Sequence, residues 1–177
     1  MRGVSAAFLL LVAVVIAQIA HYYAKLPDPM ASHFGFDGSP NGWSSRAAFF
    51  AIYLGTLLLT AGALFALAGL LTRMPDRAIN LPNRDHWLSA ERRVESLGYV
   101  QGAIGWCAIG VLLFMLLGTQ LVIRANLAGG GRLESGKFWW LLGLFACWVI
   151  LTPVRVYLRM SRVPGPEGSS QRIAPSS

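Results

Sequence analysis

Apolar residues along this chain form four runs that are separated by short polar segments. The two longest runs, Ala47 to Leu71 and Ser96 to Ile123, hold 25 and 28 positions without a charged residue. Roughly 20 helical residues span the hydrocarbon core of a bilayer, so each run is long enough to cross it. Val4 to Ala20 and Phe138 to Val154 approach this length and are extended by interfacial residues. The pattern predicts four membrane-spanning helices, at residues 4–23, 46–72, 97–123 and 138–158.

The composition agrees with this pattern, because 55% of the 177 residues are hydrophobic and only 13% are charged. Charged residues make up about a quarter of ordinary soluble domains. The expected fold class is therefore all-α, an integral membrane four-helix bundle over residues 1–160. The first run exceeds the apolar core of about 7–15 residues in cleaved signal peptides and is expected to be retained. Residues 161–177 are rich in Pro, Gly and Ser and are expected to form a disordered cytoplasmic tail.

The distribution of Lys and Arg predicts the orientation, because positive residues near helix ends are retained on the cytoplasmic side. The N-terminus, the segment between the second and third runs and the C-terminal end together carry ten positive residues, and the other two connecting segments carry five. Both termini are therefore expected in the cytoplasm of a multi-pass plasma membrane protein. This arrangement and attraction to anionic lipids account for the net charge of +7 without a nucleic-acid partner.

The first connecting segment, "LPDPMASHFGFDGSPNGWSSR", reads as an ordered outer loop. Pro27 and Pro29 push the residues before them toward extended conformations and end the first helix. Asp37-Gly38 and Asn41-Gly42 are expected tight turns, and Met30 to Phe34 an extended piece. We expect His33 to anchor the loop by a hydrogen bond, and three aromatic side chains to lie against its underside: Phe34, Phe36 and Trp43.

The second connecting segment, "INLPNRDHWLSAERR", combines turn-forming residues with a charged helix start. Ser89 is a candidate cap for a helix that runs from about Ala90 into the third span. The segment is either a docking surface for a soluble or membrane partner or a basic turn at the membrane surface with an interfacial Trp87, and the second interpretation is favoured.

Both segments resemble motifs of a bacterial membrane family, the domain of unknown function 1648 family. The resemblance singles out two sets of candidate residues. The outer-loop set is Leu26, Pro27, His33, Phe34, Gly38, Pro40 and Trp43. The inner-loop set is Asn80, Leu81, Pro82, Asn83, Trp87, Arg92 and Arg93. The same domain occurs in six-helix immunity proteins that protect against a sporulation-delaying toxin and retain a repressor at the membrane, so the resemblance implies a related architecture.

The sequence offers few candidate residues for metal binding or catalysis. His21, His33, Asp28 and Asp37 share the outer side but lack the close spacing of a zinc site, so neither a metal nor a cofactor is expected. No ionisable residue falls at mid-depth in the apolar runs, where such groups mark ion paths and catalysis. Enzymatic activity is therefore not expected. Gly62 and Ala66 in the second run, and Gly105 and Gly110 in the third, are expected at helix contacts.

These observations favour a small non-catalytic membrane protein whose first partner is the lipid bilayer. By analogy with the immunity proteins, its expected role is sensing or signalling at the envelope, with the helix at 46–72 as the route between the two motifs. The alternative is an accessory subunit of a transporter or other membrane complex. The expected protein partner, in the membrane or the cytoplasm, is not identified by the sequence.

The orientation is testable by labelling single introduced cysteines in a Cys-free background with a membrane-impermeant reagent. In intact cells, Ser39→Cys is expected to react and Ser89→Cys to stay unlabelled, because Ser39 lies in the outer segment and Ser89 in the basic inner segment. Labelling of Ser89→Cys without Ser39→Cys would contradict the predicted topology.

Overall fold

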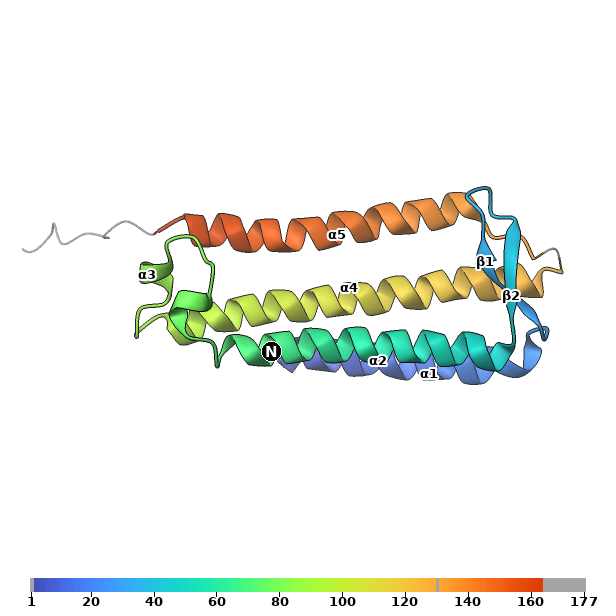
Figure 1. The fold of residues 1–177 in the computed structure, drawn as a ribbon, viewed down its shortest axis with the longest axis horizontal. Coiled ribbons are helices and arrows are strands. Elements are labelled where there is room, and N and C mark those ends of the chain that lie inside the picture. Colours follow the sequence, from blue (N-terminus) through green and yellow to red (C-terminus); the bar gives the residue numbers. More distant parts are fainter. Residues whose placement is uncertain (1, 130, 164–177) are drawn as a thin grey trace, which may run out of the picture.

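A computed structural model describes residues 2–129 and 131–163. Within them, four long helices run side by side, with a two-stranded hairpin at one end and a short helix at the other (Figure 1). The long helices are α1 (Arg2–Tyr22), α2 (Arg46–Leu71), α4 (Arg93–Leu127) and α5 (Ser135–Ser161). The shorter elements are η1 (Tyr23–Lys25), β1 (Met30–Phe34), β2 (Pro40–Ser44), η2 (Asp76–Ala78) and α3 (Arg84–Trp87).

All four long helices are long and apolar enough to cross a membrane. Helices α1 and α2 lie within two residues of the predicted spans at both ends. Helices α4 and α5 are longer than predicted at both ends, since they cover 93–127 and 135–161 in place of 97–123 and 138–158. With about 1.5 Å of rise per residue, the 35 residues of α4 exceed a hydrocarbon core of about 30 Å, so its ends extend past it. The expected tail lies, from residue 164 onward, outside the described residues.

The hairpin corrects the all-α expectation. Strands β1 and β2 pair antiparallel, with Ala31 opposite Trp43 and His33 opposite Gly42. The predicted extended piece, Met30 to Phe34, is β1. The predicted turn at Asn41-Gly42 is wrong, because both residues lie in β2 and the chain reverses between Phe34 and Pro40.

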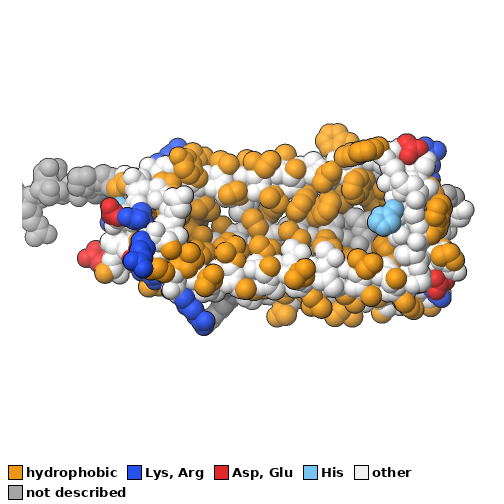
Figure 2. All heavy atoms as spheres, viewed as in Figure 1, with side chains coloured by type: hydrophobic (Ala, Val, Ile, Leu, Met, Phe, Trp, Pro, Cys, Tyr) orange, Lys and Arg blue, Asp and Glu red, His pale blue; other side chains and the backbone are white. Residues whose placement is uncertain are grey.

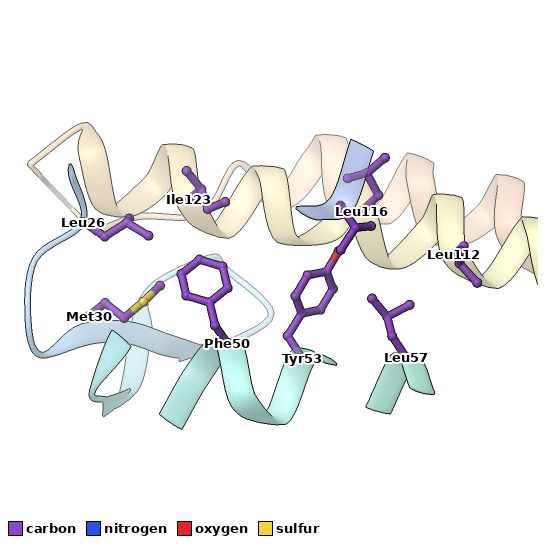
Figure 3. Close-up of a cluster of buried hydrophobic side chains, with 9 residues drawn as sticks. Leu26, Met30, Phe50, Tyr53, Leu57, Leu112, Leu116 and Ile123 are labelled. Carbon is purple, nitrogen blue, oxygen red and sulfur yellow. The ribbon is translucent and has the colours of Figure 1, made fainter. Parts of the chain in front are cut away.

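The main hydrophobic core lies between α1, α2 and α4 and reaches the hairpin. In Figure 3, Phe50 and Tyr53 of α2 face α4, while Leu26 and Met30 close the hairpin end. Met30 is fully buried, so the hairpin rests on the helices through an apolar contact. A second, smaller core of Ile79, Leu88 and Leu97 forms at the other end.

Helix α5 packs extensively against α4. Gly110 of α4 allows a close approach, because a Cβ there would lie 2.6 Å from Cδ1 of Trp148. Gly105 likewise admits Val4 of α1, so the expected helix contacts in the third span are present. The corresponding expectation for Gly62 in α2 is wrong, since a Cβ there would meet no described atom within 4 Å.

Candidate functional site

A side-chain amide joins the hairpin to α4. Asn126 accepts a hydrogen bond from the Ala31 backbone N–H through Oδ1 at 2.8 Å, and its Nδ2 donates to the Ala31 carbonyl at 2.9 Å. A side-chain amide carries the same donor and acceptor as a peptide group, so Asn126 takes the place of a neighbouring strand. The sequence analysis did not single out Asn126, which lies near the end of α4, two residues after Arg124.

The turn between the strands contacts the segment that leads into α5. The Gly38 N–H donates to the Gly35 carbonyl at 2.9 Å, and the Leu133 N–H donates to the Gly38 carbonyl at 2.8 Å. Gly38 has φ +81°, and a Cβ there would lie 2.2 Å from the Leu133 carbonyl oxygen. Position 38 therefore requires glycine for both its backbone conformation and this close approach.

Asp37 stabilises the turn electrostatically. Its carboxylate accepts hydrogen bonds from the Ser39 hydroxyl and, at 3.1 Å, from the Ser39 N–H. These bonds, with a smaller contribution from Arg132, lower the pKa of Asp37 below its ordinary value of 3.8. Because the pKa is lower in the folded protein, the stabilisation is present above the ordinary carboxyl pKa and is lost as the pH falls through the lowered one.

The aromatic residues of the outer motif are less enclosed than expected. Phe36 and Trp43 are 86% and 60% exposed, so they do not lie against the underside of the loop, and Phe34 is half-buried. The buried residues of this segment are instead Leu26, Met30 and Ala31. The Phe36 ring stacks on Trp139 of α5, with centroids 5.7 Å apart.

His33 does not form the expected hydrogen-bonded anchor; within the described residues its side chain has no hydrogen bond and is exposed. It lies over Gly42, where a Cβ would come within 3.0 Å of the His33 Cβ. The two prolines of the outer-loop set differ in burial, since Pro27 is exposed and Pro40 is half-buried.

The outer residues considered as possible metal ligands contact different partners and do not converge on one point. His21 contacts Lys25 at 2.7 Å, Asp28 pairs with Arg46 at 3.5 Å, and Asp37 bonds Ser39. Across residues 2–129 and 131–163, no group of three or more His, Cys, Asp or Glu side chains is placed to hold a metal ion.

At the opposite end, the inner motif caps α5. Nδ2 of Asn83 donates to the carbonyls of Met160 and Ser161 at 3.0 and 3.1 Å. Nε1 of Trp87 also donates to the Met160 carbonyl, at 2.6 Å. The last carbonyl groups of a helix have no partner within it, so these two side chains satisfy the C-terminal end of α5. Asn83 has φ 52°, a conformation that asparagine tolerates better than most residues.

The remaining inner residues hold the connecting segment together. Arg93 pairs with Asp76 at 2.9 Å and donates to the Met74 carbonyl at 2.9 Å, while Arg92 contacts His86. Leu81 packs on the smaller core, Pro82 is half-buried and Asn80 is exposed. Ser89 does not cap α4 with its side chain; its carbonyl accepts from Arg92 and Arg93, and the helix starts at Arg93.

A hollow lies between α2 and α5 beneath the hairpin. Its floor is α4, and Figure 2 shows the molecule hollowed between two bands of hydrophobic side chains near the hairpin end. We call it the hairpin groove; it has a volume of about 330 Å³. His33 and Ser44 of the hairpin and Tyr53 of α2 all line it.

The close approach at Gly38 is testable with Gly38→Ala and a matched control, Gly129→Ala. Gly129 also has positive φ, at +73°, but a Cβ there would meet no described atom within 4 Å. The control is expected to lose about 1–2 kcal/mol for the left-handed conformation. Gly38→Ala is expected to lose about 1–3 kcal/mol more, because Leu133 must move. Equal losses in thermal unfolding in detergent would show that the contact with Leu133 contributes nothing.

The cap on α5 is testable with Asn83→Gly, which removes the amide and keeps the positive φ permissible. We expect a loss of about 1–2 kcal/mol in the free energy of unfolding, since two carbonyls lose a donor. Asn80→Gly is the matched control, because Asn80 is exposed and its side chain makes no hydrogen bond within the described residues. If both variants unfold at the same temperature in detergent, the cap has no energetic role.

Comparison with known proteins identifies one part of the chain. Residues 9–57 match the model of a family described as a domain of unknown function, DUF1648. The matched region holds most of α1, the whole hairpin and the first part of α2, and the inner motif lies outside it. No curated protein and no solved structure matches the chain. The match therefore supports the DUF1648 family through the segment that carries the outer motif.

Proposed function

We propose that this is a non-catalytic plasma membrane protein that senses a change at the outer face of a bacterial cell and passes it to the cytoplasmic face through α5. The proposal places both termini and the inner motif in the cytoplasm and the hairpin outside. The observation that carries it is that the two motifs contact the two ends of α5. Gly38 and Phe36 reach its beginning, and Asn83 and Trp87 bind its last carbonyls.

Helix α5 is better suited to transmit a displacement than the helix at 46–72 that the sequence favoured. Phe50, Tyr53 and Leu57 fix α2 in the main core, whereas Met160 is the buried residue of α5 within the described chain. A helix with few buried side chains is displaced at lower cost than one within a core. Transmission requires two arrangements of α5 whose balance the outer event shifts.

The test is hydrogen–deuterium exchange of the segment 79–93 in lipid nanodiscs. Gly38→Ala disturbs the start of α5, and we expect it to accelerate exchange in the inner segment about fivefold, the effect of roughly 1 kcal/mol of lost protection. Gly129→Ala should leave that segment unchanged. Exchange that rises in the hairpin but stays constant at 79–93 would mean that the motifs are independent.

The second candidate is an accessory subunit of a transporter or other membrane complex. It is favoured by the large apolar side chains that α5 exposes along its length, among them Trp140 at 77%, Leu144 at 67% and Ile150 at 62%. A partner helix could cover this face as well as lipid could. A stoichiometric membrane partner that co-purifies in mild detergent would support it, and a soluble cytoplasmic regulator in the same experiment would support signalling.

A further inference from the structure

A groove lies between α4 and α5 at the end of the bundle that carries the inner motif. We call it the α4–α5 groove; it has a volume of about 400 Å³. The two helices run side by side, and both supply its walls (Figure 1). Among its described lining residues, Arg155 alone carries a formal charge. The lining includes Tyr99, Gly102 and Trp106 of α4 and Trp148, Thr152 and Arg155 of α5.

The charge of Arg155 is not paired within the protein. Its side chain is exposed and makes no hydrogen bond or ion pair in residues 2–129 and 131–163. Arg159, one helical turn further along α5, does have partners. Its Nη2 lies 3.8 Å from Oε1 of Glu95, and its Cζ lies 4.2 Å from the centroid of the Tyr99 ring. Glu95 therefore offsets the charge of Arg159, and the charge of Arg155 remains available to an anion.

Arg155 lies at the depth where a spanning helix meets the lipid headgroups. At about 1.5 Å of rise per residue, the segment from Trp139 to Arg155 is about 24 Å long, somewhat less than a hydrocarbon core of about 30 Å. Tryptophan side chains are enriched at the membrane boundary. With Trp139 at one boundary, Arg155 lies just inside the other, and its long side chain reaches the level of the lipid phosphates. An unpaired charge at this depth is costly, which favours an anionic partner.

An apolar trough continues the α4–α5 groove toward the middle of the bundle. It has a volume of about 350 Å³ and shares Trp106 and Trp148 with the groove. Beyond these two residues its described lining is aliphatic, phenyl or glycine, for example Leu113, Leu144 and Phe145. Nε1 of Trp148 donates to the Trp106 carbonyl at 3.1 Å, so this polar atom already has a partner. A charge near the boundary followed by an apolar path matches the order of head and chain in a phospholipid.

The polar groups of the α4–α5 groove favour a phosphate. A guanidinium group donates parallel N–H bonds to phosphate oxygens. The Tyr99 hydroxyl makes no hydrogen bond among the described residues and supplies a further donor in the same lining. The Thr152 hydroxyl already donates to the Trp148 carbonyl at 2.8 Å. The site therefore offers donors to one phosphate group.

The same lining disfavours the ammonium group of a zwitterionic lipid. An ammonium group is bound by carboxylates or by the open faces of aromatic rings. No Asp or Glu is among the described residues that line the α4–α5 groove, and Arg159 already lies over the Tyr99 ring. The free charge of Arg155 also repels a cation. A headgroup with net negative charge therefore fits better than a zwitterionic one.

We propose that the α4–α5 groove binds an anionic phospholipid, with its phosphate at Arg155 and Tyr99 and an acyl chain along the apolar trough. The phosphate pairs the free charge, and the chain covers Trp106 and Trp148. This binding goes beyond the proposed function and is measured independently of it. The orientation proposed above serves only to assign the lipid to the cytoplasmic leaflet.

The test is native mass spectrometry of the detergent-solubilised protein with phosphatidylglycerol and phosphatidylcholine of identical acyl chains. We expect phosphatidylglycerol to form the bound complex about fivefold or more in excess of phosphatidylcholine. Millimolar inorganic phosphate is expected to leave this complex intact, because the chain contributes to binding. Equal binding of the two lipids would overturn the proposal. Displacement by inorganic phosphate would also overturn it, since the site would then recognise phosphate without lipid.

Charge variants locate the headgroup. Arg155→Gln is expected to weaken phosphatidylglycerol binding about tenfold or more, the usual effect of losing a charge-assisted hydrogen bond. Arg73→Gln is the matched control: Arg73 is exposed at the same end of the bundle, its side chain makes no hydrogen bond in the described chain, and it does not line the α4–α5 groove. Equal losses in the two variants would overturn the proposal, because the preference would then come from net charge.

A filling variant locates the groove itself. Gly102 lines it, and a Cβ there would meet no described atom within 4 Å, so Gly102→Leu occupies the space and is expected to abolish lipid binding. Gly143→Leu is the control, since its Cβ also meets no described atom and it lines neither the groove nor the apolar trough. Gel filtration in detergent checks folding. Undiminished binding in folded Gly102→Leu would overturn the proposal; if that variant does not fold, the comparison of Arg155→Gln with Arg73→Gln decides.

Discussion

Hydrogen bonds between side-chain amides and backbone groups hold both ends of this helical bundle together. A backbone group in or near a bilayer has little water to bond, so each must find a partner within the protein. Asn126 supplies that partner to Ala31 at the hairpin, and Asn83 supplies it to the last carbonyls of α5. The positions of the hairpin, the inner segment and α5 depend on these bonds.

The two ends of the bundle are held by different interactions, although at each end a backbone group of the protein gains a hydrogen-bond partner. At the outer end, a glycine brings the turn close enough for backbone bonding to Leu133, and Met30 is buried against the helices. At the inner end, an indole and an amide reach the end of α5, and Arg93 fixes the preceding loop through Asp76. Helix α5 is thereby held at its ends, and the middle of the helix contacts α4 and the surrounding lipid.

The long helices could be predicted from the sequence because an apolar run of spanning length has few other stable forms in lipid. The extended piece at Met30 to Phe34 could be predicted because it lies between the prolines that end the first helix and the Asp37-Gly38 turn. The turn was misplaced because Asn41-Gly42 has the local chemistry of a turn but pairs with β1, where Gly42 accommodates the His33 side chain. The roles of Asn83 and Asn126 were missed because their partners lie 77 and 95 residues away in sequence.

The central claim is that the two loop motifs together fix α5 against the rest of the bundle. Electron–electron double resonance between spin labels on Gly62→Cys in α2 and Gly143→Cys in α5 measures this most directly, since a Cβ at either position meets no described atom within 4 Å. The account predicts one narrow distance distribution that broadens when Gly38→Ala and Asn83→Gly are combined and stays narrow with Gly129→Ala and Asn80→Gly. An equally narrow distribution in all of these proteins would contradict it.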